Sequence, residues 1–326
     1  MIIRLLFSGS RFSYEGCVSM NEIRNDRMIP SEHVRFCNGR IVSTMSMYLN
    51  FMPQTITPEI LNEIAATYQI SRQRAYAECL AAACEVGSDR CEREFVSEYI
   101  LPMIHEMDPA SFENDPYYQT VLFSEQKNGK WEMKFMEIAP CEAFVCNDFK
   151  IYNDGRLIPQ IGYFPRAYRY PAILENGREW MTLLPNETIT TKPAIDQAFG
   201  KVLTYGLGLG YFAFMASSKT EVSSVTVVER SRDVIELFKE WILPYFPHRE
   251  KINIICEDAF DYAGKTAPNE KYDFIFADIW HDVGDGKDLY LKFKSLEHLS
   301  PCSKHAYWLE DTIKCYLKPE LWPPRL

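Results

Sequence analysis

A short glycine-rich segment, residues 201–210, constrains the fold of this chain more than any other feature. An apolar run that ends at Tyr205 is typical of a buried strand, and a glycine then occupies every second position. These glycines are Gly206, Gly208 and Gly210. Residues 211–217, aromatic and small, are typical of a helix. A strand, a glycine turn and a helix in this order let a ligand approach bare backbone at a helix N-terminus.

Three further apolar runs follow the glycine turn, at residues 225–228, 252–256 and 272–277. Helix-length segments separate them, which predicts an α/β fold with a Rossmann-like, doubly wound, mostly parallel sheet. Each run is followed by a carboxylate, and these are Glu229, Asp258 and Asp278. Open α/β sheets bind ligands at the carboxyl ends of their strands. An acid about twenty residues after the glycine turn is the usual partner of ribose hydroxyls, so we expect a nucleoside-containing ligand.

The spacing of the glycines separates two classes of nucleoside ligand. A dinucleotide site has its third glycine three positions after the second, where this chain has Tyr211. A nicotinamide-dependent oxidoreductase is therefore disfavoured. S-adenosyl-L-methionine, which has no phosphate, is the alternative candidate cofactor.

The sequence around these strands, residues 190–315, resembles the class I S-adenosylmethionine-dependent methyltransferases. Within that superfamily it looks most like the branch of the polyamine aminopropyltransferases, the spermidine-synthase-like proteins. The resemblance depends on four stretches: residues 202–210, 225–230, 257–260 and 272–278.

The resemblance implies a cofactor site at the strand ends. The three glycines would face the methionine part of the cofactor, and Glu229 would hold the ribose. Asp258 would accept from the adenine amine, with Ala259 beside the ring. Two further residues of the matching stretches are assigned to the same site, and these are Tyr205 and Arg230.

The loop after the last of these strands is rich in groups that could act on an acceptor. Asp278 is expected at the transfer point, where a carboxylate can orient or deprotonate a nucleophile. His281 is a second candidate base, because its ordinary pKa lies near neutrality. Trp280 could cover the sulfonium or an acceptor ammonium by a cation–π contact, and so counts among the cofactor-binding candidates.

Some positions depart from the patterns of the resembling families. Thr204 stands where methyltransferases usually carry an acid, and Leu209 stands where aminopropyltransferases carry an aspartate. We expect a methyltransferase that acts on a small-molecule amine or hydroxyl acceptor. One alternative is a polyamine aminopropyltransferase-like enzyme that uses decarboxylated S-adenosylmethionine. The other is a protein that binds an adenosyl ligand without catalysis.

Composition limits the partners and the compartment. The net charge of the 326 residues is −10, which argues against nucleic acid, because binding phosphates needs a basic surface. No apolar run approaches 18 residues, so no membrane span is expected. The ten cysteines form no Cys-x-x-Cys pair and are read as reduced thiols of a cytoplasmic protein. The six histidines are dispersed, and no metal site is expected.

Two regions are expected, a helical and β-meander region over residues 1–189 and the Rossmann-like domain over residues 190–326. Three polar residues are candidate helix starts, and these are Thr57, Ser71 and Ser88. Three dipeptides predict the hairpin turns of an antiparallel meander over residues 116–184, and these are Asn128-Gly129, Asp154-Gly155 and Asn176-Gly177. The meander could be a lid over the acceptor or the surface of a homodimer. Other predicted elements are a helix over 193–199, a helix over 287–299 and a strand over 306–313.

Overall fold

The computed structural model describes residues 30–324, which form two compact units. Within the described range, unit 1 comprises residues 30–108, 138–168 and 314–324, and unit 2 comprises residues 109–137 and 169–313. The sequence predicted one boundary near residue 190 instead. The difference arises because the strands between residues 126 and 182 do not form one meander but pair in two separate sheets. Residues 1–29, which belong to the first predicted region, lie outside the described range.

Unit 1 packs helices against a small sheet with strand order β1-β5-β4. Strand β1 is parallel to β5, whereas β4 is antiparallel to it. A buried aromatic stack joins helix to sheet, since the rings of Tyr76 and Tyr163 lie 4.2 Å apart. The elements are α1 (Glu32–Phe51), α2 (Pro58–Tyr68), α3 (Arg72–Ala83), α4 (Arg90–Phe95), η1 (Val96–Ile100), α5 (Leu101–Met103), β1 (Ile104–Glu106), β4 (Phe144–Ile151), β5 (Leu157–Tyr163) and η5 (Pro319–Leu321).

The helix starts of unit 1 follow the sequence closely at two of three positions. The side chains of Thr57 and Ser71 cap α2 and α3 by accepting from backbone N–H groups, as predicted. The prediction for Ser88 is wrong. Asp89 caps α4 instead, because its carboxylate accepts from the N–H of Glu92 at 2.9 Å.

The smaller sheet of unit 2 has four strands in the order β2-β3-β6-β7. Its hairpin turn between β6 and β7 is the predicted Asn176-Gly177, and both residues have positive φ, 51° and 78°. Two short helices precede the sheet. The elements are α6 (Ala110–Glu113), α7 (Pro116–Thr120), β2 (Gln126–Asn128), β3 (Trp131–Ile138), β6 (Tyr168–Glu175) and β7 (Arg178–Thr182).

The larger sheet of unit 2 has five parallel strands in the order β10-β9-β8-β11-β12. This mixed α/β arrangement is Rossmann-like, which confirms the predicted fold class. The chain runs outward from β8 to β9 and β10 and then returns to the other side of β8, so the order reverses between β8 and β11. The elements are α8 (Pro185–Gln197), β8 (Gly200–Tyr205), α9 (Tyr211–Ser217), β9 (Val222–Glu229), α10 (Arg232–Trp241), η2 (Leu243–Tyr245), η3 (Arg249–Lys251), β10 (Ile252–Cys256), α11 (Ala259–Lys265), α12 (Ala267–Glu270), β11 (Phe274–Ala277), α13 (Val283–Leu296), η4 (Glu297–Leu299), β12 (Lys304–Tyr307) and α14 (Glu310–Tyr316).

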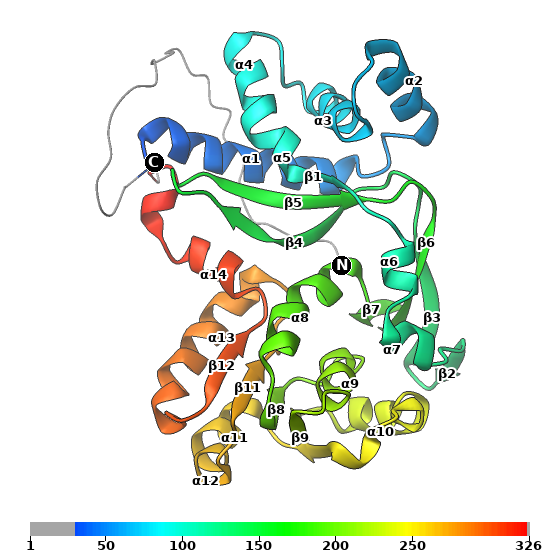
Figure 1. The fold of residues 1–326 in the computed structure, drawn as a ribbon, viewed down its shortest axis with the longest axis vertical. Helices are drawn as coiled ribbons and strands as arrows, with labels where there is room; N and C mark the ends of the chain where they lie inside the picture. The colour runs from blue at the N-terminus through cyan, green and yellow to red at the C-terminus, as the bar shows by residue number, and fades with distance from the viewer. Residues whose placement is uncertain (1–29, 325–326) are drawn as a thin grey trace. The chain divides into compact units, whose positions relative to one another are not determined.

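Helices cover both faces of the parallel sheet (Figure 1). On one face, Phe212 of α9 packs against Phe276 of β11, with ring centroids 4.5 Å apart. On the other face, Tyr205 of β8 packs against Phe293 of α13 at 4.9 Å and against Tyr262 of α11 at 6.4 Å. Successive side chains of a strand point to opposite faces, and residues 202–205 of β8 are all buried, so the sheet is covered on both sides of this strand.

Two predicted elements near the sheet are wrong. The helix expected over 193–199 begins at Pro185, because the N–H groups of Glu187 and Thr188 bond the carbonyl of Leu184 and close a first turn there. Pro193 lies inside this helix. The strand expected over 306–313 ends at Tyr307. Leu309 takes a φ of 53°, and its carbonyl then accepts from the N–H of Ile313 in α14.

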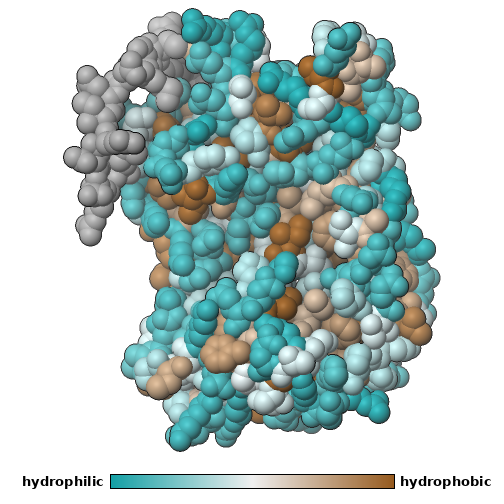
Figure 2. Space-filling view, in the orientation of Figure 1, coloured by the Kyte–Doolittle hydropathy of each residue, from teal (hydrophilic) through white to brown (hydrophobic). Residues whose placement is uncertain are grey.

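The surface is mostly hydrophilic on the face that Figure 2 shows. In the described range, no helix has the length and apolarity that crossing a bilayer requires. All nine cysteines within that range are free, and its His, Cys, Asp and Glu side chains form no group that could hold a metal ion.

Candidate functional site

The glycine turn after β8 contains glycines of two kinds. A Cβ on Gly206 would lie 1.9 Å from the carbonyl oxygen of Asp278, and one on Gly210 would lie 2.3 Å from the ring of Phe238. These two positions exclude any side chain because the protein itself fills the space. A Cβ on Gly208 would meet no atom within 4 Å, although its φ is also positive, at 52°. Only at Gly208 does the bare backbone face open space.

Glu229, the last residue of β9, ties the glycine turn to the next strand. Its Oε2 accepts from the N–H of Leu207 at 3.3 Å, and its Oε1 accepts from the N–H of Ser231 at 2.8 Å. Each carboxylate oxygen can accept more than one hydrogen bond, so neither contact prevents Glu229 from binding a ligand hydroxyl. Arg230, the adjacent residue, is exposed.

Asp258 caps α11 at the end of the neighbouring strand β10. Its Oδ1 accepts from the N–H groups of Phe260 and Asp261, at 2.9 and 3.2 Å. The carboxylate is exposed, its Oδ2 takes part in neither bond, and Ala259 beside it is buried. The structure thus places Glu229, Asp258 and the turn on successive strand ends of one edge.

Asp278 follows β11 on the other side of the turn. Its N–H bonds the carbonyl of Tyr205 at 2.9 Å, which places it directly against the glycine turn. Protein atoms enclose its carboxyl group, although part of the residue still reaches solvent. Burial disfavours the charged form and raises the pKa of Asp278 to about 7. The group can therefore exchange a proton near neutral pH.

Glu187, in the first turn of α8, is a further candidate residue that the sequence reasoning did not include. Its Oε1 accepts from the hydroxyl of Thr182 at 2.9 Å. Burial raises the pKa of Glu187 to about 8, and the nearby charges of Asp278 and Glu179 act in the same direction. The available signal was Pro185 two residues earlier, since proline favours the first position of a helix and would have placed Glu187 in that first turn.

The loop after Asp278 is organised by hydrogen bonds. Asp282 and Asp285 form a capping box at the start of α13. Asp285 also accepts from the N–H of His281, whose ring nitrogen Nδ1 lies 3.2 Å from the Asp285 carboxylate. The side chain of His281 is 60% exposed, and its ring lies 6.1 Å from that of Trp180 on β7. His281 is thus held at the surface, where a carboxylate fixes its orientation.

Two predicted cofactor residues have buried side chains. Trp280 is 4% exposed, and a Cβ on Gly286 would lie 2.8 Å from its ring. Its Nε1 donor has no hydrogen-bond partner among the described residues, which is uncommon for a buried polar group. The Tyr205 side chain lies in the core between α11 and α13, so only its backbone borders the glycine turn.

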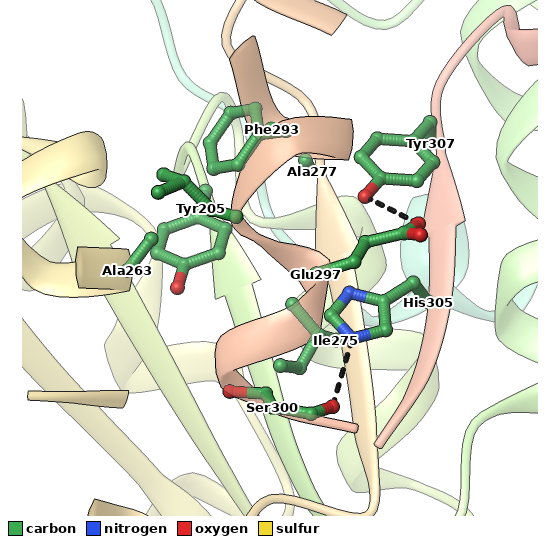
Figure 3. A pocket seen from close by; sticks show the side chains of 10 residues that line it. Tyr205, Ala263, Ile275, Ala277, Phe293, Glu297, Ser300, His305 and Tyr307 are labelled. Carbon is green, nitrogen blue, oxygen red and sulfur yellow. Dashed lines mark hydrogen bonds between the residues drawn. The ribbon is translucent and has the colours of Figure 1, made fainter. Parts of the chain in front are cut away.

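A small pocket lies beneath the same edge, between the sheet and helices α11 and α13 (Figure 3). Two pairs of polar groups in it satisfy each other. Tyr307 donates to Glu297 at 2.9 Å, and His305 lies 3.2 Å from the carbonyl oxygen of Ser300. The rest of the lining is mainly apolar. Polar groups that pair with each other among apolar side chains are typical of a protein core. We therefore place the candidate ligand site at the strand ends and not in this pocket.

Comparison with known proteins gives weak structural similarity to solved structures and no match in sequence. Neither a protein-family model nor a curated protein sequence matches the chain. Among solved structures, the chain is similar to spermidine synthase from Thermotoga maritima, with 16% sequence identity and a TM-score of 0.28. The match covers 37% of this chain and 48% of the spermidine synthase chain, so it spans about half of that protein. A likeness of this size assigns neither a reaction nor a ligand.

Proposed function

We propose that this protein is a transferase that binds an adenosyl sulfonium ligand and alkylates a small amine or hydroxyl acceptor. The observation that carries the proposal is the open left-handed backbone of Gly208. The turn that contains Gly208 lies between the end of β9, with Glu229, and the end of β11, with Asp278. A nucleoside with a flexible, phosphate-free extension is suited to such an edge.

The chain's residues fit the parts of S-adenosyl-L-methionine. The methionine part would lie against the backbone of Gly208, where a side chain would take its space. Glu229 would accept from the ribose hydroxyls, and Asp258 would accept from the adenine amine through Oδ2. Ala259 would lie beside the ring, and the exposed Arg230 would border the ribose.

The chemistry asks little of the protein beyond position and one proton transfer. A bound sulfonium supplies an electrophilic carbon and a thioether leaving group. The Asp278 carboxylate would take the proton of the acceptor as the acceptor's lone pair forms the new bond to that carbon. The carbon–sulfur bond breaks, and its electron pair remains on sulfur. Holding the acceptor in line with that bond supplies most of the rate.

We propose methyl transfer as the first version of this reaction and aminopropyl transfer as the second. Aminopropyl transfer is favoured by an excess of acidic side chains among the residues that directly follow the five strands. The basic side chains at these positions are Arg230 and His281. Decarboxylated S-adenosylmethionine suits an acidic edge because it carries no carboxylate that these acids would repel. Methyl transfer is favoured by Leu209, which is buried and offers no carboxylate to an aminopropyl group.

Calorimetry tests the ligand class directly. S-adenosylmethionine, its decarboxylated form, S-adenosylhomocysteine, methylthioadenosine and NAD would each be titrated into the protein. We expect the adenosyl sulfur compounds to bind and NAD not to bind. Binding of NAD alone would contradict the proposal. Binding without transfer to any acceptor in a radiolabel assay would favour the non-catalytic alternative.

The variant Gly208→Val tests the site. A branched side chain at this position enters the space assigned to the ligand and should abolish binding while circular dichroism stays unchanged. Gly129→Val is the matched control, because Gly129 also has a positive φ, 58°, and also faces open space, but lies in the β2–β3 hairpin. Both variants carry similar backbone strain, so loss of binding only in Gly208→Val would locate the ligand.

A further inference from the structure

A short helix from much earlier in the chain, α7, bonds to the glycine turn. The carboxylate of Asp115 caps this helix by accepting from the N–H of Tyr117 at 2.9 Å. Tyr117 is fully buried, and its hydroxyl donates a hydrogen bond to the backbone carbonyl of Leu209, 92 positions later in the sequence. The first turn of α7 therefore places a hydrogen-bond donor against the middle of the glycine turn.

The backbone on each side of Gly208 is fixed by a side chain from outside the turn. On one side, the N–H of Leu207 donates to the carboxylate of Glu229 at 3.3 Å. On the other side, the carbonyl of Leu209 accepts from Tyr117. Glycine allows the backbone many conformations, so a turn with a glycine at every second position does not select one by itself. These contacts select the conformation in which Gly208 faces open space.

The surroundings of Tyr117 keep its hydroxyl in place. Its ring lies edge-on to those of Phe214 and Tyr211 in α9, with centroids 5.2 and 5.5 Å apart. Tyr211 in turn donates to the carboxylate of Asp115 at 2.9 Å, which is a second hydrogen bond between the two segments. Burial first, and then the charge of Asp115, raise the pKa of Tyr117 well above its usual range. The hydroxyl therefore stays protonated and remains a donor.

We propose that Tyr117 is a positioning residue for the adenosyl ligand, because its hydroxyl holds the Leu209 carbonyl and so keeps Gly208 in the conformation that the ligand binds. The inference rests on the proposed function and adds a residue that acts through the turn. Without the hydroxyl, the carbonyl of Leu209 would be buried without this partner, and rotating it toward water would become favourable. The fraction of protein with the binding-competent turn would fall, and the apparent affinity would fall with it.

The variant Tyr117→Phe removes only the hydroxyl and tests the proposal by calorimetry with S-adenosylhomocysteine. Well below the melting temperature, the variant should bind this ligand several-fold more weakly than the wild-type protein. Tyr76→Phe is the matched control, because Tyr76 is equally buried and its hydroxyl also donates to a backbone carbonyl, that of Cys141 at 2.9 Å, but within unit 1. The control should lower the melting temperature and leave the affinity unchanged.

Hydrogen exchange of the Gly210 amide provides a second measurement that needs no ligand. This N–H donates to the carbonyl of Leu207 at 2.8 Å and closes the turn, so its exchange reports local opening. In the ligand-free protein it should exchange about ten-fold faster in Tyr117→Phe than in the wild type, the scale expected for one lost hydrogen bond. Tyr76→Phe should leave its exchange rate unchanged.

Two results would overturn the role of Tyr117. One is equal affinity for S-adenosylhomocysteine in the wild-type protein and Tyr117→Phe. The other is exchange of the Gly210 amide that is equally fast in Tyr117→Phe and Tyr76→Phe, since the effect would then be general destabilisation. Failure of S-adenosylhomocysteine to bind the wild-type protein would contradict the proposed function instead. The exchange rates of the ligand-free protein would then decide whether Tyr117 positions the turn.

Discussion

The two halves of the strand-end edge treat their carboxyl groups in opposite ways. On the β9–β10 side, Glu229 and Asp258 each accept two hydrogen bonds from backbone N–H groups. On the β11–α8 side, Asp278 and Glu187 are enclosed, and burial raises the pKa of both toward or above neutrality. On the first side the backbone orients the carboxylates, and on the second side the charge depends on a proton.

This difference assigns different tasks to similar residues. A carboxylate held by the backbone is oriented before a ligand arrives and suits the recognition of hydroxyl and amine donors. A carboxyl group that titrates near neutral pH suits proton transfer. If the comparison is correct, substitutions on the β9–β10 side should weaken binding, and substitutions on the β11–α8 side should lower turnover.

The largest expected effect is on turnover, from Asp278→Asn. The amide keeps the shape of the side chain but cannot take a proton, so turnover should fall by about 10²-fold or more, the usual scale for a positioned acid–base group. Affinity for S-adenosylhomocysteine should change by only a few-fold. A loss of that affinity would make Asp278 a binding residue. Unchanged turnover would make His281 the next candidate base.

The next effect, on binding, is expected from Glu229→Ala. Hydrogen bonds to a charged acceptor contribute roughly 1.5–3 kcal/mol each, so loss of the ribose contacts should weaken adenosyl ligands by about ten-fold or more. Calorimetry with S-adenosylhomocysteine measures this. Glu229→Gln keeps one oxygen acceptor and should lose less. Equal affinity in the wild-type protein and Glu229→Ala would remove Glu229 from the site.

The β9–β10 side could be predicted from the sequence because its residues are close to the strands that position them. Glu229 and Asp258 directly follow apolar runs, and the parallel sheet brings those ends together. The structure also places β11 beside β8, so the end of the apolar run over 272–277 meets the glycine turn.

The β11–α8 side could be predicted only in part. Asp278 could be singled out because it follows a strand, and its role stays a prediction. The properties of Glu187 depend on Thr182 from β7 and on burial, neither of which leaves a local pattern. The helix start at Pro185 was also missed, because Pro193 was read as the first helical residue. Where a side chain's properties come from contacts distant in sequence, residue spacing carries little information about them.

The pH dependence of turnover provides a smaller test of the comparison. In the proposed mechanism the charged form of Asp278 is the base, and its pKa of about 7 means that this form increases as the pH rises from 6 to 8. The value of kcat/KM for the acceptor should therefore rise about ten-fold per pH unit well below pH 7 and level off above it, as expected for one essential base. Asp278→Asn should show no such rise. A turnover that falls across this range in the wild-type protein would contradict the assignment of Asp278 as base.

The smallest expected effect is on stability, again from Asp278. Its pKa is higher in the folded protein than in the unfolded chain, where it lies near 3.9. Between these values the folded state binds more protons, so the stability associated with this group is fully present below about pH 4 and is lost as the pH rises through about 7.

Asp278→Asn removes the buried charge and should raise the melting temperature at pH 8 by a few degrees, with a smaller difference at pH 5. Glu229→Gln, on the other side of the edge, should give no stabilisation at pH 8, because backbone N–H groups already satisfy its carboxylate. Equal changes in melting temperature at pH 8 from the two variants would mean that the carboxyl groups on the two sides of the edge have similar environments.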